Sequence, residues 1–166
     1  MVKMTSAVSA KNDHLQAIGL ITVNFAMLEL TIASGAWFFL GKTGAIVTAE
    51  LSFKGLVALF SSLYRNWTTD AKKVGDLDSL LKRVMQAEEK RNIISHSLWT
   101  LGKSDETITR IKTTAKMSKG LKHSFEQVTV DDLERIADEI AETAADFQAF
   151  YISDVTEQLS AASDRT

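Results

Sequence analysis

Apolar residues recur every three or four positions along most of the chain, which is the spacing of one face of a helix. Four long segments show it: from about Asn12 to Leu40, from about Thr48 to Trp67, from Thr69 or Asp70 to Leu98, and from Thr129 onward. Amphipathic helices joined by short connections are the parts of an antiparallel four-helix bundle. The pattern therefore predicts an all-α fold of that kind.

The ends of these segments carry residues that start and stop helices. The sequence GKTG places two glycines after the first segment, where they should break it. Asp70 is suited to cap the third helix and Thr129 the fourth, whose Asp131 and Asp132 favour the positive end of the helix dipole. The second segment is apolar nearly all round, which predicts a central or interface helix. The absence of proline suits long uninterrupted helices.

Residues 15 to 40 are apolar for long enough to cross a bilayer. Glu29 lies at the centre of this segment, among the polar residues Gln16, Thr22, Asn24, Thr31 and Ser34. An ionised carboxylate in the middle of a membrane is costly, so we expect a buried helix of a soluble bundle. Glu29 would then need a partner, and Arg91 or Arg65 could supply it. A membrane-associated protein is the alternative.

The segment between the third and fourth helices, residues 100 to 127, has a different composition. The stretch TITRIKTT is rich in threonine and isoleucine, and SKG supplies a glycine turn. Both features are typical of strands and the turns between them. We expect a short β-hairpin or extended arm here.

Charge is unevenly distributed along the chain. Residues 1 to 123 carry seventeen bases and ten acids, whereas residues 124 to 166 carry two bases and eleven acids. The arm is basic and, from residue 107 to 123, contains no acid; its cations are Arg110, Lys112, Lys116, Lys119 and Lys122. Cations of this kind bind nucleic-acid phosphates, although charged loops also serve solubility alone. These five residues are the candidate nucleic-acid-binding residues.

Composition excludes several kinds of site. The chain has no cysteine, which removes disulfides, thiolate metal sites and a cysteine nucleophile. His14 and His123 are isolated, and we expect neither to bind a metal. No metal and no cofactor are predicted. The length of 166 residues suits one domain, residues 12–158, between flexible tails at 1–11 and 159–166.

One stretch resembles a phosphate-binding loop by its letters alone. AWFFLGKT matches the pattern of a small residue, four variable residues and Gly-Lys-Thr. Such a loop joins a strand to a helix through glycines that let the backbone wrap a phosphate. Here the variable positions are bulky and belong to a predicted helix, so Lys42 and Thr43 are expected to be ordinary loop residues.

The strongest candidate site is the stretch EEKRNIISHSLW, residues 88 to 99. On a helix Asn92 and His96 share a face, and Arg91 lies about 140° from His96 around the axis. Around these three are the residues with expected supporting roles: Glu88, Glu89, Ser95 and Trp99. A fixed positive charge, an amide and a group that titrates near neutral pH together suit a phosphodiester.

Arg91, the polar Asn92 and His96 after four intervening residues resemble the Arg-X4-6-His motif of HEPN domains. HEPN stands for higher eukaryotes and prokaryotes nucleotide-binding. The helical bundle and the position of the motif on a late helix are also similar to that family. The likeness covers most of the chain as architecture but only about nine residues as a motif, the stretch RNIISHSLW.

The resemblance implies a metal-independent endoribonuclease of the toxin or defence type. In such enzymes the ribose 2'-hydroxyl attacks the adjacent phosphate and leaves a 2',3'-cyclic phosphate, at a site that a homodimer completes. His96 would be the general acid or base, Arg91 would bind the phosphate, and Asn92 would orient one of them. Glu88 or Glu89 would position Arg91. RNA is then the expected substrate, the cytoplasm the expected location, and a protein antitoxin or regulator a further expected partner; no membrane partner is expected.

A different class of protein fits the same features. Many HEPN domains lack activity and serve as homodimeric interaction or regulatory modules. His96 would then be a structural residue at a helix end, where the last carbonyls favour a cation. Leu98 also stands where some family members carry a tyrosine that an antitoxin modifies, which argues against that form of regulation here.

Overall fold

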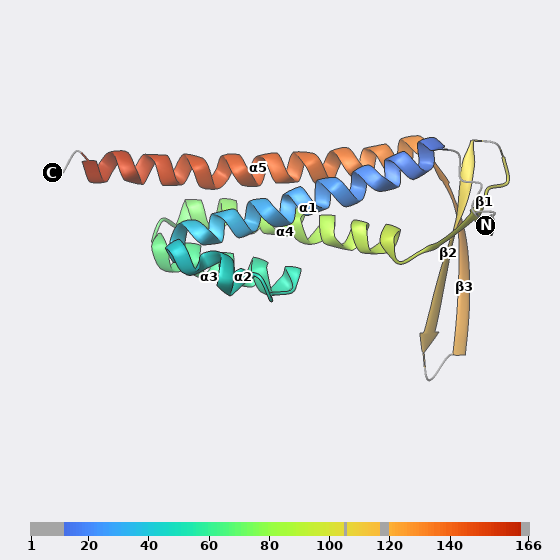
Figure 1. Cartoon of the computed structure of the whole chain (residues 1–166), viewed down its shortest axis with the longest axis horizontal. Helices are drawn as coiled ribbons and strands as arrows, with labels where there is room; N and C mark the ends of the chain where they lie inside the picture. Colours follow the sequence, from blue (N-terminus) through green and yellow to red (C-terminus); the bar gives the residue numbers. More distant parts are fainter. Residues whose placement is uncertain (1–11, 105, 117–119, 164–166) are drawn as a thin grey trace, which may run out of the picture. The chain divides into compact units, whose positions relative to one another are not determined.

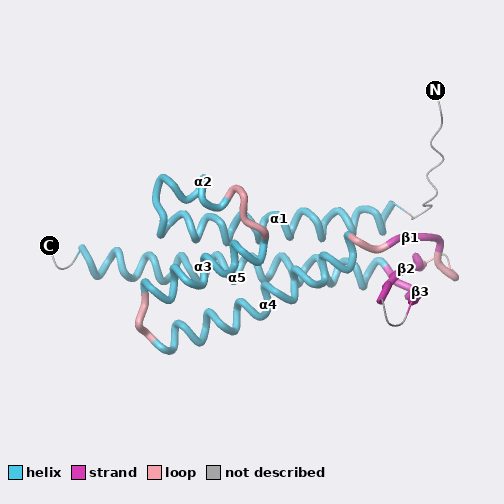
Figure 2. The backbone as a smooth tube through the Cα atoms, turned by 90° about the horizontal axis from the view of Figure 1, so that it is seen from below, coloured by secondary structure: helices cyan, strands magenta, loops and turns pink. Residues whose placement is uncertain are grey.

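The computed structural model describes residues 12–104, 106–116 and 120–163 (Figure 1). Along the chain the elements are α1 (Asn12–Leu40), the 3-10 helix η1 (Gly41–Thr43), α2 (Gly44–Thr48), α3 (Phe53–Trp67), α4 (Ala71–Ser95), β1 (Leu98–Leu101), β2 (Thr107–Lys116), β3 (Gly120–Thr129) and α5 (Val130–Ser163). The described chain is mainly helical, with all three strands between α4 and α5 (Figure 2). The predicted helical fold with a β arm is therefore confirmed in outline.

Two compact units make up the chain, and α1, α4 and α5 each pass from one to the other. The first contains Glu89–Asp138 and the part of α1 up to Val23; the second contains Asn24–Glu88 and α5 from Glu139 onward. The predicted single domain of residues 12–158 spans both units. The predicted tail at 1–11 lies outside the described residues, and α5 continues to Ser163, into the segment 159–166 that was predicted as the other tail.

Three helices begin with a side chain that accepts a backbone N–H. Ser52 accepts from Gly55 N at the start of α3, at 3.2 Å. Asp70 accepts from the N–H groups of Lys72 and Lys73 at the start of α4. Thr129 accepts from Asp132 N at the start of α5, at 3.2 Å. These bonds satisfy the first N–H groups of each helix, which have no partner inside it. The caps expected at Asp70 and Thr129 are therefore confirmed.

Gly41 follows the end of α1, as expected of a helix-breaking glycine, and has φ of 61°, a conformation that side chains rarely adopt. Gly41 begins η1, whereas Gly44 does not break a helix but begins α2. The second helix does not begin at Thr48 as predicted: Thr48 ends the short α2, where its hydroxyl accepts from the indole N–H of Trp37 at 2.7 Å. A helix, not a strand, precedes Lys42 and Thr43, so the geometry of a phosphate-binding loop is absent at this point of the described chain.

The core of the second unit is aromatic. Phe60 lies 4.7 Å from Phe147 between ring centroids, and Tyr64 lies 5.1 Å from Phe150. Aliphatic side chains from four helices complete this buried core, among them Leu28, Ile32, Leu56, Val57, Leu77, Val84 and Ile140. Aromatic pairs at these distances contribute more than their buried area alone.

A buried carboxylate joins three helices of the second unit. Asp154 of α5 accepts a hydrogen bond from the hydroxyl of Tyr64 in α3 and pairs with Nζ of Lys73 in α4 at 3.0 Å. Both Tyr64 and Asp154 are buried. Burial, together with the hydrogen bond to Asp154, raises the pKa of Tyr64, so its phenol stays neutral. A charge in the core is tolerated only with partners of this kind.

The apolar length of α1 leaves two interpretations. By length and composition alone Asn12–Thr48 could cross a membrane, and 33% of its most apolar stretch is buried. The core helix of a soluble protein passes the same test. The exposed apolar side chains of α1 include Leu20, Val23, Met27, Leu30 and Phe38.

The first unit contains an antiparallel sheet of order β1-β2-β3. The register pairs Leu98 with Ile111 and Ile111 with Phe125. Because neighbouring residues of a strand point to opposite faces, this row lies on one face and the row Trp99–Arg110–Glu126 on the other. At the turn between β1 and β2, a Cβ on Gly102 would come within 2.1 Å of the Thr107 carbonyl oxygen, so only glycine fits there.

We expect Asp154→Ala to lower the free energy of unfolding by about 3 kcal/mol, because it leaves Lys73 and the Tyr64 hydroxyl without their partner in the core. Urea denaturation measures the change. The matched control is Asp146→Ala in α5, which removes the exposed partner of Arg83 in α4. This variant should lower the free energy of unfolding by less than about 1 kcal/mol. Equal losses of unfolding free energy in the two variants would show that the bonds of Asp154 contribute no more to stability than an exposed ion pair does.

Candidate functional site at the end of helix α4

Helix α4 ends because the side chains that follow it occupy its last carbonyls. The N–H of His96 still donates to Asn92 O at 3.0 Å, but the Ser97 hydroxyl takes Ile93 O and the Trp99 indole takes Ile94 O at 3.2 Å. The last carbonyls of a helix need partners of this kind. The prediction that the third helix extends to Leu98 is therefore wrong, since Leu98 begins β1.

Arg91 and Asn92 lie near the end of α4, and His96 follows the last helical residue, Ser95. Arg91 and Asn92 are partly exposed, and His96 is exposed in the turn after the helix. The Nε atom of Arg91 is buried, so the inner part of the guanidinium lies within the fold. The bond between His96 N and Asn92 O preserves the one-turn spacing predicted for these two residues. A cation, an amide and an imidazole thus reach the surface at one helix end.

The residues with predicted supporting roles occupy varied positions. Glu89 and Ser95 are exposed and Glu88 is partly exposed on α4. Trp99 does not lie on the helix with the other predicted supporting residues, because it belongs to β1 and contacts α4 through its indole N–H. Its observed position supports the turn that carries His96.

Glu29 was expected to be buried, but it is partly exposed on α1. Arg65, one of its two predicted partners, pairs instead with Asp78 and donates to the hydroxyl of Ser61. The charge at Glu29 therefore has access to water, and a buried ion pair is not needed to explain it.

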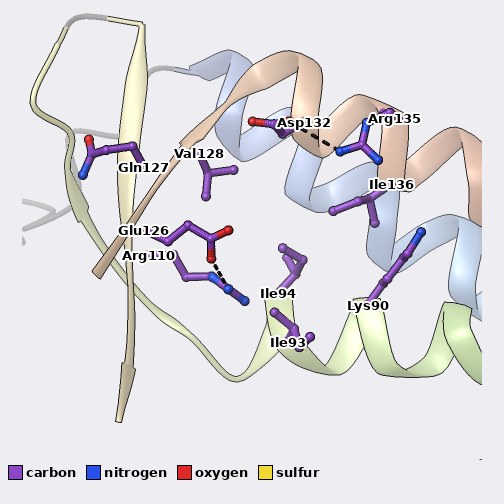
Figure 3. A pocket seen from close by; sticks show the side chains of 10 residues that line it. All are labelled: Lys90, Ile93, Ile94, Arg110, Glu126, Gln127, Val128, Asp132, Arg135 and Ile136. Carbon is purple, nitrogen blue, oxygen red and sulfur yellow. Dashed lines mark hydrogen bonds and ion pairs between the residues drawn. The ribbon is translucent and has the colours of Figure 1, made fainter. Parts of the chain in front are cut away.

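A pocket of about 230 Å³ lies on another side of α4. Its walls come from the end of α4, the sheet and the start of α5, and the lining residues are Lys90, Ile93, Ile94, Arg110, Glu126, Gln127, Val128, Asp132, Arg135 and Ile136 (Figure 3). With about 100° between helix positions, Lys90, Ile93 and Ile94 share one side, whereas Arg91, Asn92 and His96 point elsewhere. The pocket and the predicted site are separate surfaces.

The pocket combines an apolar floor with paired charges. Ile93, Ile94, Val128 and Ile136 supply the apolar part. Arg110 pairs with Glu126 across the sheet, and Arg135 pairs with Asp132 at 3.5 Å (Figure 3). The sequence pattern did not single out Lys90, Asp132 or Arg135 as pocket residues, because their neighbours come from distant parts of the chain. The arrangement suits a small ligand with an apolar body and a charged end.

The cations of the arm have different environments. Arg110 is paired with Glu126 and is mostly covered. Lys112 and Lys122 are exposed on β2 and β3. Lys116 is the last residue of β2, and Lys119 lies outside the described residues. Among the predicted nucleic-acid-binding residues whose burial is described, Lys112 and Lys122 are thus the exposed ones.

Two histidines were expected to bind no metal. His14 is buried in α1, and His123 shares a hydrogen bond of 2.9 Å with the hydroxyl of Thr113. Among the described residues, no three His, Asp or Glu side chains gather as a metal site would require.

Comparisons with known proteins give no relative. No family model matches the chain, and neither a curated protein nor a solved structure is detectably similar to it.

The start of α5, beside the pocket, is held by a reciprocal cap. The carboxylate of Asp132 accepts from the hydroxyl of Thr129 at 2.8 Å and from its N–H at 3.3 Å, while Thr129 accepts from Asp132 N. These bonds to Thr129 lower the pKa of Asp132 below its ordinary value of 3.8, and the positive charge of Arg135 lowers it further by a smaller amount. Its charged form is therefore favoured by the folded state.

We expect Asp132→Ala to cost about 1 kcal/mol of unfolding free energy at pH 7. The difference from wild type should be complete above pH 3.8 and should shrink as the pH falls through the lowered pKa of the folded protein, because the folded carboxylate then becomes protonated. Urea denaturation between pH 7 and pH 2.5 measures it. Asp131→Ala, which changes the neighbouring acid of the first turn, is the control. It should lower the free energy of unfolding by less than Asp132→Ala does. A difference that grows on acidification would contradict this assignment.

Proposed function

We propose that this protein is a metal-independent endoribonuclease of the HEPN type, acting as a toxin or defence effector in the cytoplasm. In this proposal α1, α3, α4 and α5 form an antiparallel four-helix bundle, and two copies form a homodimer. RNA is the substrate, and cleavage produces a 2',3'-cyclic phosphate and a 5'-hydroxyl end. A protein antitoxin or regulator would restrain the activity.

The observation that carries the proposal is the arrangement at the end of α4. Arg91 and Asn92 are partly exposed near the end of α4, and the imidazole of His96, in the turn that follows, is exposed to solvent. A group that takes and gives protons in a reaction must be accessible to the substrate. A histidine with only a structural role at a helix end would not require an arginine and an amide beside it.

The reaction assigns one task to each side chain. His96 takes the proton of the 2'-hydroxyl, or gives a proton to the departing 5'-oxygen; a second copy of the motif would perform the other transfer. The 2'-oxygen forms a bond to phosphorus as the bond to the 5'-oxygen breaks. Arg91 stabilises the negative charge that grows on the phosphate oxygens. Asn92 donates to the phosphate or orients the imidazole.

The second candidate function is a non-catalytic homodimeric interaction or regulatory module. It is favoured by the exposed apolar residues of α1 and α2, of which Ile46 is 76% exposed. Such side chains suit a protein partner. This alternative and the enzyme differ at His96, because only the enzyme has an activity that depends on that side chain.

We expect wild-type protein to cleave mixed cellular RNA in the presence of EDTA and to leave 2',3'-cyclic phosphate ends. Arg91→Ala and His96→Ala should each lower the rate by at least about 100-fold, because each removes charge stabilisation or proton transfer. End-group analysis of the fragments, together with initial rates, measures the effect.

Arg83→Ala is the matched control, because Arg83 lies two turns earlier on α4 and pairs with Asp146. It should cleave at the wild-type rate. Circular dichroism establishes that every variant is folded. Absence of cleavage by the folded wild-type dimer, in fractions freed of any co-purified partner, would reject the enzyme in favour of the interaction module.

A further inference from the structure

The pocket at the end of α4 is built around a covered guanidinium. All its lining residues belong to the first unit, within Glu89–Asp138. The side chain of Arg110 is only 17% exposed. Figure 3 shows its guanidinium pointing toward Ile93 and Ile94 at the floor of the pocket. Because arginine is rarely covered unless its donors are bonded, the bonds of this side chain decide what the pocket can hold.

Arg110 has hydrogen-bond donors that the described part of the chain does not use. Its guanidinium donates there from Nη2 to one carboxylate oxygen of Glu126. A guanidinium has five N–H donors in a planar fork, so this bond leaves one edge with two parallel N–H groups. Covered donors without an acceptor are costly. A carboxylate matches such an edge with both of its oxygens.

The two carboxylates of the pocket do not close it to an anion. The side chain of Glu126 is 56% exposed against 17% for Arg110, so its charge is screened by water. Asp132 is bonded to the hydroxyl and the N–H of Thr129 at the start of α5. Neither carboxylate therefore occupies the remaining edge of the guanidinium.

The face of the sheet that forms a wall of the pocket is cationic beyond Arg110. Because alternate residues of a strand share a face, Lys112 of β2 and Lys122 of β3 lie on the same face as Arg110. Both lysines are exposed, and residues 107–123 contain five Lys and Arg and no acid. The field of these cations favours an anion over a cation in the pocket.

The opposite face of the sheet has different chemistry. Leu98, Ile111 and Phe125 form an apolar row there, and Phe125 is 68% exposed. Among the strand residues that the structure describes, no Lys or Arg lies on that face. The attraction for an anion is thus a property of the pocket face alone.

The floor of the pocket is aliphatic. Ile93 and Ile94 of α4, Val128 of β3 and Ile136 of α5 form it. Among the described residues that line the pocket none is aromatic, so the floor suits an alkyl chain better than a flat ring that stacks. The volume of about 230 Å³ gives room for roughly fifteen water-sized groups, at about 10–15 Å³ each. A short alkyl chain with one anionic head is of this size.

We propose that the pocket binds a small aliphatic carboxylate. Its two oxygens accept from the remaining edge of Arg110, and its alkyl chain covers the isoleucines of the floor. A phosphate monoester is a poorer fit, because its second negative charge would meet Glu126. This inference goes beyond the proposed function and does not depend on it, since the pocket and the predicted site are separate surfaces.

The test titrates octanoate into the full chain with its isoleucine methyl groups labelled with carbon-13. NMR spectra should show saturable shifts of the methyl groups of Ile93, Ile94 and Ile136. Octylammonium has the same chain with the opposite charge and should bind at least about 10-fold more weakly. Acetate has the head without the chain and should also bind at least about 10-fold more weakly, because it covers none of the floor.

Two variants should change the affinity for octanoate in opposite directions. Arg110→Gln removes the guanidinium and should weaken binding by about 10- to 150-fold, because charge-assisted hydrogen bonds are lost. Glu126→Gln removes the competing charge but keeps the size of the side chain, and it should strengthen binding by about 2- to 5-fold. An arginine that served only to pair with Glu126 across the sheet would not produce the second result.

Arg65→Gln is the matched control, because Arg65 pairs with Asp78 in the other compact unit, and it should bind octanoate as wild type does. Three results would overturn the inference: absence of saturable shifts in wild type, equal affinity for octanoate and octylammonium, or unchanged affinity in folded Arg110→Gln. Amide spectra show whether each variant is folded. If Arg110→Gln does not fold, Glu126→Gln decides, since equal or weaker binding of octanoate by that variant would reject the contact with Arg110.

Discussion

The candidate site of the first unit depends on how the last carbonyls of α4 are bonded. If the helix continued, Ile93 O and Ile94 O would accept from the N–H groups four residues later. Instead Ile93 O accepts from the Ser97 hydroxyl, and Ile94 O accepts from the Trp99 indole and, at 3.5 Å, from the Ser97 N–H. The chain leaves the helix after Ser95, which places His96 in an exposed turn and begins β1 two residues later. One set of hydrogen bonds thus fixes both the proposed site and the first strand of the sheet.

The same helix end separates three surfaces with different chemistry. Ile93 and Ile94 face the pocket, whose charges are neutralised in pairs such as Arg110 with Glu126. Arg91 and His96 point elsewhere around the helix. The far face of the sheet carries the apolar row instead. The register places Lys112 and Lys122 on the same face as Arg110 and Glu126, opposite the apolar row.

What the sequence predicts well is what depends on neighbouring residues. Asp70 and Thr129 cap helices through N–H groups two or three positions away, so their roles can be inferred from the local pattern. The end of α4 was missed because Leu98 continues the helical spacing, while the Trp99 indole that replaces the next turn is visible only in three dimensions. Asp154 was missed for the same reason, since its partner Tyr64 is 90 residues away.

The candidate sites differ in the same way. Arg91, Asn92 and His96 lie within six residues, so their position near the end of α4 follows from the local sequence. The row of Leu98, Ile111 and Phe125 exists only because the register of three strands aligns it, and a shift of one residue in any strand would turn that side chain to the other face. Folding gains little from a ring that is 68% exposed. A β-branched residue would serve the strand at Phe125 as well or better, so the stability of the sheet does not require an aromatic ring at this position.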